Sequence, residues 1–417
     1  MKITVISIGD ELLVGQVINT LAADMARILD TRGWEIQRVL TVGDTKEAIT
    51  KAVKDALEAT EVVITTGGLG PTRDDITKKV LCDIFGGKLV EDPATLENVK
   101  DIVSRRGFRL NGLTVAQALV PSSCRVIQNR VGTAPIMWFE RDGHTLVAMP
   151  GVPFETTEML KREVFPQLLE HYPSDISTAR ATLIVTGYTE SGLAEHIAKW
   201  EDSLPAHLHL AYLPRPGLVR LRIDGHHPDS SFIDREVRQY ADSLQSLLGN
   251  AVVAKDDLTP AEILLNICRD KGLSLTTAES CTGGNIAHEL TMVAGCSDVF
   301  NGGVVAYSNN VKKNLLSVKA ESLEQHGAVS IPVVEQMAQG ACHATKADVA
   351  VATSGIAGPG GATPGKPVGT VCIAVATPRG VISSTEHFPG NRSRVIDAAT
   401  IKALTMAITA LNSGGDC

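Results

Sequence analysis

The sequence has few aromatic residues and no excess of positive charge. Aromatic side chains make up 4% of the 417 residues, which argues against base stacking as a way of binding nucleic acid. Lys and Arg number 39 against 47 Asp and Glu, for a net charge of -8. No broad basic face is therefore expected, and direct nucleic-acid binding is disfavoured, although local basic pockets remain compatible with this composition.

The chain also lacks paired cysteines and long apolar runs. None of the eight cysteines forms a C-x-x-C pair, which is typical of a reducing compartment where most cysteines are buried as small hydrophobes. No run is long enough to span a bilayer. The apolar start, residues 3–8, is cut off by Gly9-Asp10-Glu11, so we expect a first strand and not an export signal. These features predict a cytoplasmic protein with no membrane contact.

What is present indicates a multidomain α/β protein. Hydrophobic residues at 44% and charged residues at 21% predict a globular protein with a full core, and the length favours two or three domains. Residues 1–172 alternate predicted strands (3–8, 35–40, 62–65) with predicted helices (21–29, 46–57). Continuous apolar strands between amphipathic helices predict a parallel sheet covered on both faces.

Two further domains are predicted. Residues 173–252 read as a small α+β connector, with strands at 182–186, 208–213 and 219–224 and helices at 190–200 and 234–248, the last capped by Asp234. His207, His209, His226 and His227 could bind a metal there, but solvated strand ends are favoured because carboxylates at ligand spacing are missing. Residues 253–417 form a second alternating domain, with strands at 273–277, 303–307, 349–353 and 369–376. The predicted fold is thus two three-layer α/β/α domains joined by the connector.

A hydroxyl and a thiol lie side by side where one strand of the C-terminal domain turns into a helix. Ser280 and Cys281 follow the strand, and Gly283 and Gly284 let a substrate approach the backbone. The first free N–H groups of a helix can receive a developing negative charge. The pattern indicates a nucleophile, but a tight joint with Ser280 or Thr282 as the N-cap explains it equally well.

A lysine follows the next strand. Asn309 or Asn310 is a candidate helix cap, and Val311, Leu315, Leu316 and Val318 define the buried face of the predicted helix. Lys312 borders that face, whereas Lys313 lies on the opposite side. Partial burial lowers the pKa of a lysine, and such a lysine can accept a proton from serine. Taken alone, an ordinary surface lysine is the more common alternative.

Two more segments of this domain suit a nucleotide. The glycine-rich loop 353–367 exposes N–H groups that suit phosphate or a flat ring, through Thr353, Ser354, Gly355 and Gly358, or it is only a flexible connection. Arg392, before the last helix, is well placed for a phosphate, although a solvent-exposed charge is the commoner reading.

The N-terminal domain carries a second glycine-rich loop after a buried strand. Thr66, Gly67, Gly68 and Gly70 can wrap a phosphate, and carboxylates follow directly at Asp74 and Asp75. Asp44 and Glu155 follow other strands and could add ligands for a divalent cation. Each of these residues, taken singly, is more often part of a turn or an N-cap.

Residues 260–413 closely resemble the C-terminal domain of the CinA family. The matching motifs are AESCTGG around Ser280, VAYSN followed by VK, HGAVS at 326–330, SGIAGPGG, KPVGTV and the GNR that ends at Arg392. The resemblance implies a nicotinamide mononucleotide deamidase, with Ser280 as nucleophile, Lys312 as its base and no cofactor. Because His326 is the single histidine in these segments, a Cys281–His pair is disfavoured.

The remaining residues of the expected site take roles consistent with that activity. Tyr307 is expected to tune the dyad and Arg392 to hold the phosphate. The oxyanion is expected on N–H groups near Cys281 and Thr282, or near Ser354 and Gly355. The full set expected to bind substrate is Cys281, Thr282, Gly283, Asn309, Thr353, Ser354, Gly355, Gly358 and Arg392.

Residues 1–172 resemble the molybdopterin-binding fold, in the version fused to CinA proteins, which also shows the GTAP of residues 132–135. The resemblance implies pterin binding or, preferred here, metal-dependent ADP-ribose pyrophosphatase activity, with Mg, Mn or Co held by Asp44, Asp74 and Glu155. The connector resembles a KH-like module but lacks a clear GXXG loop, so no RNA binding is assigned. A homodimer is also implied.

The favoured hypothesis is therefore a two-headed enzyme that acts on nicotinamide mononucleotide and ADP-ribose. The alternative is a non-catalytic protein, either a pterin-nucleotide binder or a partner in DNA uptake. Neither basic nor aromatic patterning supports direct DNA contact in that alternative.

Overall fold

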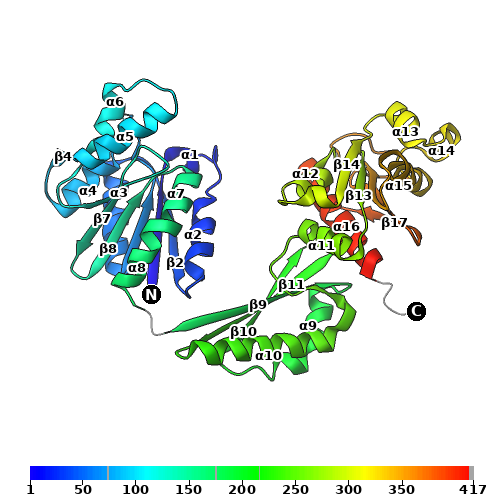
Figure 1. Cartoon of the computed structure of the whole chain (residues 1–417), viewed down its shortest axis with the longest axis horizontal. Coiled ribbons are helices and arrows are strands. Elements are labelled where there is room, and N and C mark those ends of the chain that lie inside the picture. Colours follow the sequence, from blue (N-terminus) through cyan, green and yellow to red (C-terminus); the bar gives the residue numbers. More distant parts are fainter. Residues whose placement is uncertain (73–74, 174–175, 216, 413–417) are drawn as a thin grey trace. The chain divides into compact units, whose positions relative to one another are not determined.

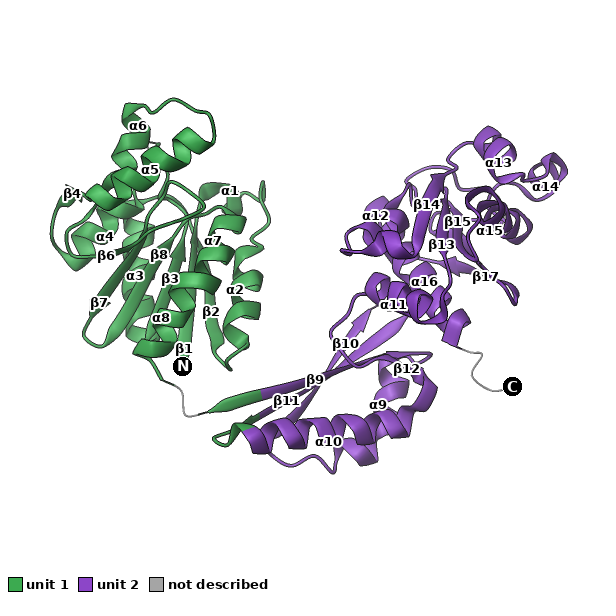
Figure 2. Cartoon of the chain, viewed as in Figure 1, with its two compact units in different colours: residues 1–178, 226–230 green, residues 179–225, 231–417 purple. Residues whose placement is uncertain are grey.

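The computed structural model describes residues 1–72, 75–173, 176–215 and 217–412 (Figure 1). The chain divides into two compact units (Figure 2). The first contains residues 1–178 and 226–230, and the second contains residues 179–225 and 231–417.

The first unit alternates strands and helices along the chain. Its elements are β1 Lys2–Ile8, α1 Asp10–Leu13, α2 Leu21–Asp30, β2 Glu35–Val42, α3 Lys46–Ala59, β3 Val62–Thr66, α4 Thr77–Phe85, β4 Leu89–Glu91, α5 Pro93–Arg105, α6 Gly112–Val115, β5 Leu119–Pro121, β6 Arg125–Ile127, β7 Ile136–Arg141, β8 His144–Met149, α7 Pro153–Met159 and α8 Phe165–His171. The predicted strands and helices of this region are confirmed, with shifts of a few residues at their ends.

One sheet runs through this unit in the order β2-β1-β3-β8-β7-β6. Alternate residues of β1 point to opposite faces: Ile3 and Val5 pack with α2, α7 and α8, while Ile6 and Ile8 pack with α3 and α4. The sheet is thus the middle layer of an α/β/α sandwich, and the α/β class is confirmed.

The parallel sheet predicted for this unit is confirmed for the strands from which it was predicted, but it does not extend to the whole sheet. The β2, β1, β3 and β8 strands are parallel, but β7 runs antiparallel to β8 and β6 antiparallel to β7. The reversal is made by Asp142-Gly143, both at positive φ, between the paired residues Arg141 and His144. An Asp-Gly pair between apolar runs is a strong hairpin signal, and it explains why the chain turns back without a helix.

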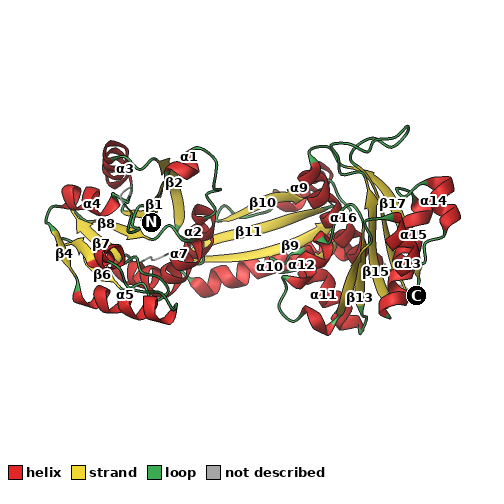
Figure 3. Ribbon diagram, turned by 90° about the horizontal axis from the view of Figure 1, so that it is seen from above, coloured by secondary structure: helices red, strands yellow, loops and turns green. Residues whose placement is uncertain are grey.

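The second unit contains most of the connector and the C-terminal domain. The connector elements are β9 Ser177–Thr186, α9 Glu190–Glu201, β10 Leu208–Arg215, β11 Leu218–His227, α10 Ser230–Leu248 and β12 Val252–Ala254. Its sheet has the order β10-β11-β9-β12, and α9 and α10 cover one face (Figure 3). The α+β expectation is confirmed, although α10 begins at Ser230, so Asp234 lies inside the helix and is not its cap.

The C-terminal domain has the elements α11 Pro260–Lys271, β13 Leu275–Glu279, α12 Asn285–Thr291, β14 Phe300–Val305, α13 Asn309–Leu316, α14 Ala320–His326, α15 Ile331–Thr345, β15 Val349–Gly355, β16 Thr370–Thr377, β17 Gly380–His387 and α16 Arg392–Asn412. The sheet order is β14-β13-β15-β16-β17. Only β14, β13 and β15 are parallel in this described sheet, since β16 and β17 are antiparallel.

Residue size differs between the two faces of this sheet. On one face, Val349, Val351 and Ile373 pack against α11 and α16. On the other, Ala350, Ala352 and Ala374 pack against α13 and α15, where Ala338 and Ala341 face them. Small side chains on both sides let α15 and the sheet approach closely.

The last helix corrects the expectation that no segment is long enough to span a bilayer. In the described part of the chain, α16 alone has the length and hydropathy that a membrane-spanning helix needs. Its buried residues, among them Ala399, Leu404 and Ile408, instead join the main core of the C-terminal domain. A core helix of a folded domain passes the same length test.

Candidate active site

The sheet of the C-terminal domain carries the proposed nucleophile at the carboxyl end of its second strand. Ser280 directly follows β13, which lies between β14 and β15. Its backbone N–H donates to the carbonyl of Thr353 at 3.0 Å, so the turn is tied to the end of β15. The Ser280 side chain is 9% exposed and opens into a cavity of about 230 Å³.

The capping predicted for the following helix is wrong. The N-cap of α12 is Gly284, at φ 100°, and neither Ser280 nor Thr282 caps the helix. The fully buried carboxylate of Glu279 accepts the N–H groups of Gly284, Ile286 and Ala287 at 2.8–3.0 Å. Because Glu279 occupies these donors, the first turn of α12 is not available to a developing oxyanion.

Lys312 lies against the serine. Its side chain is 1% exposed, and its Nζ lies 2.9 Å from the Ser280 Oγ. Ser308 is the N-cap of α13, in place of the predicted Asn309 or Asn310. The periodicity argument that put Lys312 at the border of the buried face understated its burial.

Two carbonyls fix the protons of this amine. Lys312 Nζ donates to the backbone oxygens of Ala306 at 2.7 Å and Tyr307 at 3.4 Å. A carbonyl oxygen only accepts, so these two contacts hold two N–H groups whatever the charge of the lysine. In the neutral amine, the third direction is the lone pair, and it points at the Ser280 hydroxyl.

Burial sets the protonation of both candidate reactive groups. It lowers the pKa of Lys312, and the Cys281 thiol beside it opposes this shift. Burial also raises the pKa of Cys281 to about 12, with a further contribution from the charge of Glu279. A thiol with this pKa is protonated at neutral pH, and Lys312 Nζ contacts the Ser280 Oγ, so Ser280 is better suited than Cys281 to be the nucleophile.

The cavity brings together most of the residues that the sequence predicted. It is lined by Ser280, Cys281, Tyr307, Asn309, Lys312, Ala328, Val329, Ser354, Gly355, Ala357 and Arg392. Ala328, Val329 and Ala357 were missed, because small apolar side chains carry no chemistry that a pattern would mark. The Ser354 hydroxyl donates to the carbonyl of Ala328 at 2.6 Å and ties the two walls together.

Four predicted substrate-binding residues lie outside this lining. The Thr282 hydroxyl donates to Glu279 at 2.8 Å and is 2.7 Å from the Thr353 hydroxyl, so both threonines support the turn from behind. Gly283, at φ 65°, shapes the same turn. The carbonyl of Gly358 accepts from Arg392 Nη1 at 2.8 Å and positions the guanidinium.

Tyr307 is not placed to tune the dyad through its hydroxyl. Its side chain is 61% exposed, and the hydroxyl accepts from Arg392 Nη2 at 2.9 Å. Only its backbone oxygen reaches Lys312. Tyr307 and Arg392 thus form a pair at the mouth of the cavity, where a charged group of a ligand would lie.

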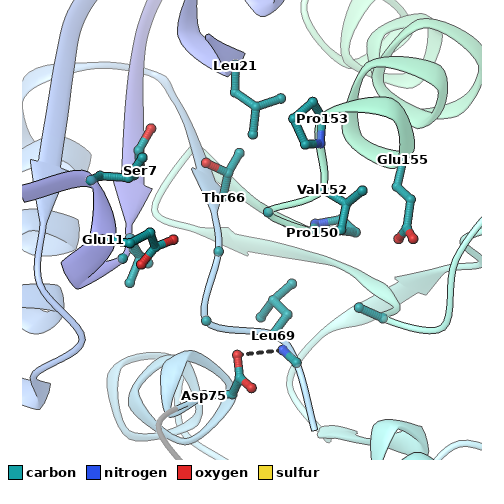
Figure 4. Close-up of a pocket in the computed structure, with 18 of the residues that line it drawn as sticks. Ser7, Glu11, Leu21, Thr66, Leu69, Asp75, Pro150, Val152, Pro153 and Glu155 are labelled. Carbon is teal, nitrogen blue, oxygen red and sulfur yellow. Dashed lines mark hydrogen bonds between the residues drawn. The ribbon is translucent and has the colours of Figure 1, made fainter. Parts of the chain in front are cut away.

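The first unit contains a larger pocket, of about 460 Å³, at the carboxyl ends of β1, β3 and β8 (Figure 4). The predicted phosphate loop lines it with Thr66, Gly67, Gly68 and Gly70. Gly67 and Gly68 both have positive φ. Asp75 holds the loop by accepting the N–H of Gly70 at 2.8 Å.

The carboxylates expected to hold a metal have other partners. Asp44 and Asp10 exchange backbone-to-carboxylate hydrogen bonds of 3.0 and 3.2 Å. Glu155 accepts from Asn129 Nδ2 at 3.0 Å and lies 3.8 Å from Arg106 Nη2. The third predicted ligand, Asp74, lies outside the described residues.

Within the described ranges, no three His, Cys, Asp or Glu side chains group together as metal ligands. The described residues of the first unit therefore do not fit a divalent metal, and no metal-dependent step is derived for this pocket. In the connector, His207 also has a partner within the protein, because it pairs with Glu236 on α10. The spacing of residues in the sequence did not reveal this carboxylate.

A buried lysine near this pocket was missed. Lys78 on α4 is 8% exposed, and its Nζ donates to the backbone and side-chain oxygens of Gln117, at 2.8 and 3.2 Å. Burial lowers the pKa of Lys78 to about 8, against the opposing charge of Asp75. Gln117 lines the pocket. Lys78 and Lys79 are adjacent, and the sequence does not show which of the two is buried.

Comparisons with known proteins cover both units. Residues 4–170 match the family model described as "Probable molybdopterin binding domain", and residues 258–411 match "CinA C-terminal domain". A CinA-like protein of Flavobacterium psychrophilum is 39% identical over 97% of both chains, and one of Chloroherpeton thalassium is 41% identical over 90% of both.

Among solved structures, the competence/damage inducible protein CihA of Agrobacterium tumefaciens is 41% identical. It covers 37% of this chain and 93% of its own, with a TM-score of 0.36. The full-length identities and the two family models lead to one conclusion: the chain belongs to the CinA family, and joins a molybdopterin-binding-like domain to a CinA C-terminal domain.

Proposed function

We propose that the C-terminal domain is an amidohydrolase that converts nicotinamide mononucleotide into nicotinate mononucleotide and ammonia. The observation that supports it best is the contact at 2.9 Å between the buried Lys312 Nζ and the Ser280 Oγ, in the lining of one cavity. The amine has a lowered pKa, and two carbonyls direct its lone pair at the serine. This is the arrangement that activates a serine without a histidine or a metal.

In the proposed acylation step, Lys312 takes the hydroxyl proton of Ser280, and the Ser280 oxygen attacks the carboxamide carbon. The tetrahedral intermediate collapses with cleavage of the C–N bond, and the Lys312 ammonium returns its proton to the leaving nitrogen, which departs as ammonia. A nicotinoyl ester on Ser280 remains. Lys312 then removes a proton from water, and the water oxygen attacks the ester carbon. As the bond to Ser280 breaks, the Lys312 ammonium protonates the serine oxygen, which releases the acid and restores both residues.

The surroundings of the dyad suit this substrate. The pyridinium ring withdraws electrons from the amide carbon and makes a modest nucleophile sufficient. Ala328, Val329 and Ala357 offer an apolar wall for the ring. Arg392 at the mouth, which Gly358 and Tyr307 hold in place, offers a positive charge for the phosphate. Since Glu279 occupies the helix donors, we assign the oxyanion to the N–H groups of Cys281 and Thr282.

The direct test is incubation of the full chain with nicotinamide mononucleotide, with ammonia and nicotinate mononucleotide quantified together. Equal amounts of the two products are expected. Nicotinamide riboside, which lacks the phosphate, should show a KM higher by about tenfold or more, because it forfeits a charge-assisted contact with Arg392. Absence of ammonia with either substrate would reject the proposal.

A second activity is proposed for the N-terminal pocket, with ADP-ribose as its ligand and hydrolysis of the pyrophosphate bond as its reaction. The observation in its favour is the Gly67-Gly68 turn, which has positive φ at both residues and lines a pocket of about 460 Å³ at a strand end. Binding is what the described residues support. The hydrolytic step is proposed from the family resemblance, and Asp74, which that proposal includes, lies outside the described residues.

Gly68→Ala is expected to weaken ADP-ribose binding by about tenfold or more. Gly68 has φ 64°, and an added Cβ would lie 2.1 Å from the Thr77 Oγ, so the loop must shift. Calorimetry with the full chain measures the affinity. Gly86→Ala is the matched control, because Gly86 has φ 80° but no atom within 4 Å of an added Cβ. An equal loss of ADP-ribose affinity in both variants would show that backbone strain alone weakens binding. Tight pterin binding without ADP-ribose turnover would favour the non-catalytic alternative.

A further inference from the structure

Helix α15 meets the end of α13 at a glycine. A Cβ added to Gly340 would lie 1.9 Å from the carbonyl oxygen of Leu316 and 2.6 Å from its carbon. Gly340 lies in the interior of α15, and its φ is not in the left-handed region. Helix geometry therefore does not call for glycine at this position, where alanine would be the better helix former. The contact with α13 is the feature that excludes a side chain.

The contacted turn belongs to the same short helix as the proposed base. Leu316 lies four residues after Lys312, so the two side chains share one face of α13. The carbonyl of Lys312 accepts the N–H groups of both Ser317 and Val318, which closes the turn back onto the lysine backbone. A displacement of the Leu316 peptide therefore moves Lys312 with it.

A second tie joins the same two segments. Gln336, one helical turn before Gly340, accepts the N–H of Lys319 at 2.9 Å and donates to the Ser322 hydroxyl at 2.8 Å. Leu316 and Val318, at 1% and 3% exposure, pack against the buried face of α15. The α13 end is thus held by direct backbone contact, side-chain hydrogen bonds and apolar packing.

We propose that Gly340 is a positioning residue for the Ser280–Lys312 dyad: its missing side chain lets α15 set how deeply α13, and with it Lys312, enters the site. The inference rests on the proposed deamidase function. A methyl group at Gly340 requires the Leu316 peptide to retreat by roughly 1.5 Å to reach an ordinary contact distance. Misplacement of a catalytic group by about 1 Å can cost about 10²-fold in rate.

The test is Gly340→Ala in the full chain. We expect kcat for nicotinamide mononucleotide to fall by about 10²-fold while KM changes by less than about twofold, because Arg392 and the apolar wall lie outside α13. The thermal unfolding midpoint should fall, whereas alanine at an uncontacted helix position would raise it. Gln339→Ala is the control, since Gln339 is the exposed neighbour on α15, and wild-type kcat is expected for it.

A readout independent of the substrate separates the inference from the proposed function. The rate at which a small sulfonyl fluoride labels Ser280 reports activation of the serine by Lys312, and it should fall in Gly340→Ala. The pH dependence of this labelling should shift as well, because the amine changes its surroundings. Wild-type labelling together with wild-type kcat in Gly340→Ala would overturn the inference.

A different set of results is expected if the proposed deamidase function is wrong. A wild-type chain that releases no ammonia, but whose Ser280 labelling falls in Gly340→Ala, would reject the deamidase and keep the positioning role. Where Gly340→Ala is recovered unfolded, Gln336→Leu carries the test, because it removes both hydrogen bonds to the segment after α13. A lower kcat at unchanged KM is expected for it, and an unchanged kcat would overturn the inference.

Discussion

Replacing Ser280 with alanine is expected to lower kcat for ammonia release from nicotinamide mononucleotide by a factor of at least about 10³. The hydroxyl is the single group in the proposed mechanism that forms a covalent bond to the substrate, and the step it performs has no substitute in the cavity. Water would have to attack the amide directly, with only the oxyanion donors and binding left to help. The loss of activity is measured by quantifying ammonia and nicotinate mononucleotide together.

The neighbouring thiol is the matched control for this prediction. Cys281→Ala changes the adjacent residue in the same turn by a similar volume, and Cys281 also lines the cavity. Because burial raises the pKa of Cys281 to about 12, we expect the thiol to take no nucleophilic part, and the variant should keep kcat within about tenfold of wild type. Activity retained in Ser280→Ala and lost in Cys281→Ala would reverse the assignment of the nucleophile.

Binding by the inactive variant separates chemistry from recognition. Ser280→Ala removes one oxygen from a side chain that is 9% exposed, and leaves Arg392 and the apolar wall unchanged. The Kd of the variant for nicotinamide mononucleotide should therefore stay close to that of the wild type. A Kd raised as strongly as kcat is lowered would indicate that the substitution disturbs the turn and would leave the covalent role unsupported.

The residues of this site could be predicted from sequence because each sits at a strand end or on a helix face with a regular period. Ser280 and Cys281 follow an apolar run, and the spacing from Lys312 to Leu315 and Leu316 put the lysine near the core. In parallel strands the carboxyl ends meet at one edge of the sheet, so these segments were expected to converge. The structure brings them to hydrogen-bond distance.

The capping pattern could not be predicted in the same way. Local rules assign an N-cap to a Ser, Thr or Asn just before the helix. Glu279 instead reaches forward from the end of β13 and takes three N–H groups of α12, an arrangement that depends on the tight turn between them. The first turn of α12 is thereby excluded as an oxyanion site, so this error bears on the mechanism.

Contacts between segments that are far apart in the chain could not be predicted from the sequence either. Tyr307 and Arg392 are 85 residues apart in the sequence, and no period or spacing relates them. The backbone contact at Gly340 has even less of a signature, because a glycine inside a helix usually signals only lower helix propensity. The antiparallel strands were different: Asp142-Gly143 is a hairpin signal that the sequence does contain.

Replacing Lys312 with methionine is expected to lower kcat by about 10²–10⁴-fold, which is the usual contribution of a general base. Methionine keeps most of the volume of the lysine stem in a position that is 1% exposed, so the loss should reflect the missing amine. Lys313→Met is the matched control, because Lys313 is the next residue on α13 and is exposed. Wild-type kcat is expected for the control.

Arginine at the same position distinguishes a base from a mere positive charge. A guanidinium stays protonated at all relevant pH values and cannot take the Ser280 proton. Lys312→Arg should therefore be as inactive as Lys312→Met. If Lys312 instead acted by placing a positive charge beside the oxyanion, Lys312→Arg would keep part of the activity, and the assignment as base would be wrong.

The pH profile of the wild type completes the argument, and its sign follows from the burial of the amine. The active form is the neutral amine, so kcat/KM should rise with pH through the pKa of Lys312 and fall as protonation increases below it. Burial lowers that pKa from the ordinary 10.5, which moves this limb to lower pH and leaves more neutral amine at physiological pH. An activity that falls as pH rises toward 10.5, with the protein still folded, would require a protonated lysine and contradict the proposed mechanism.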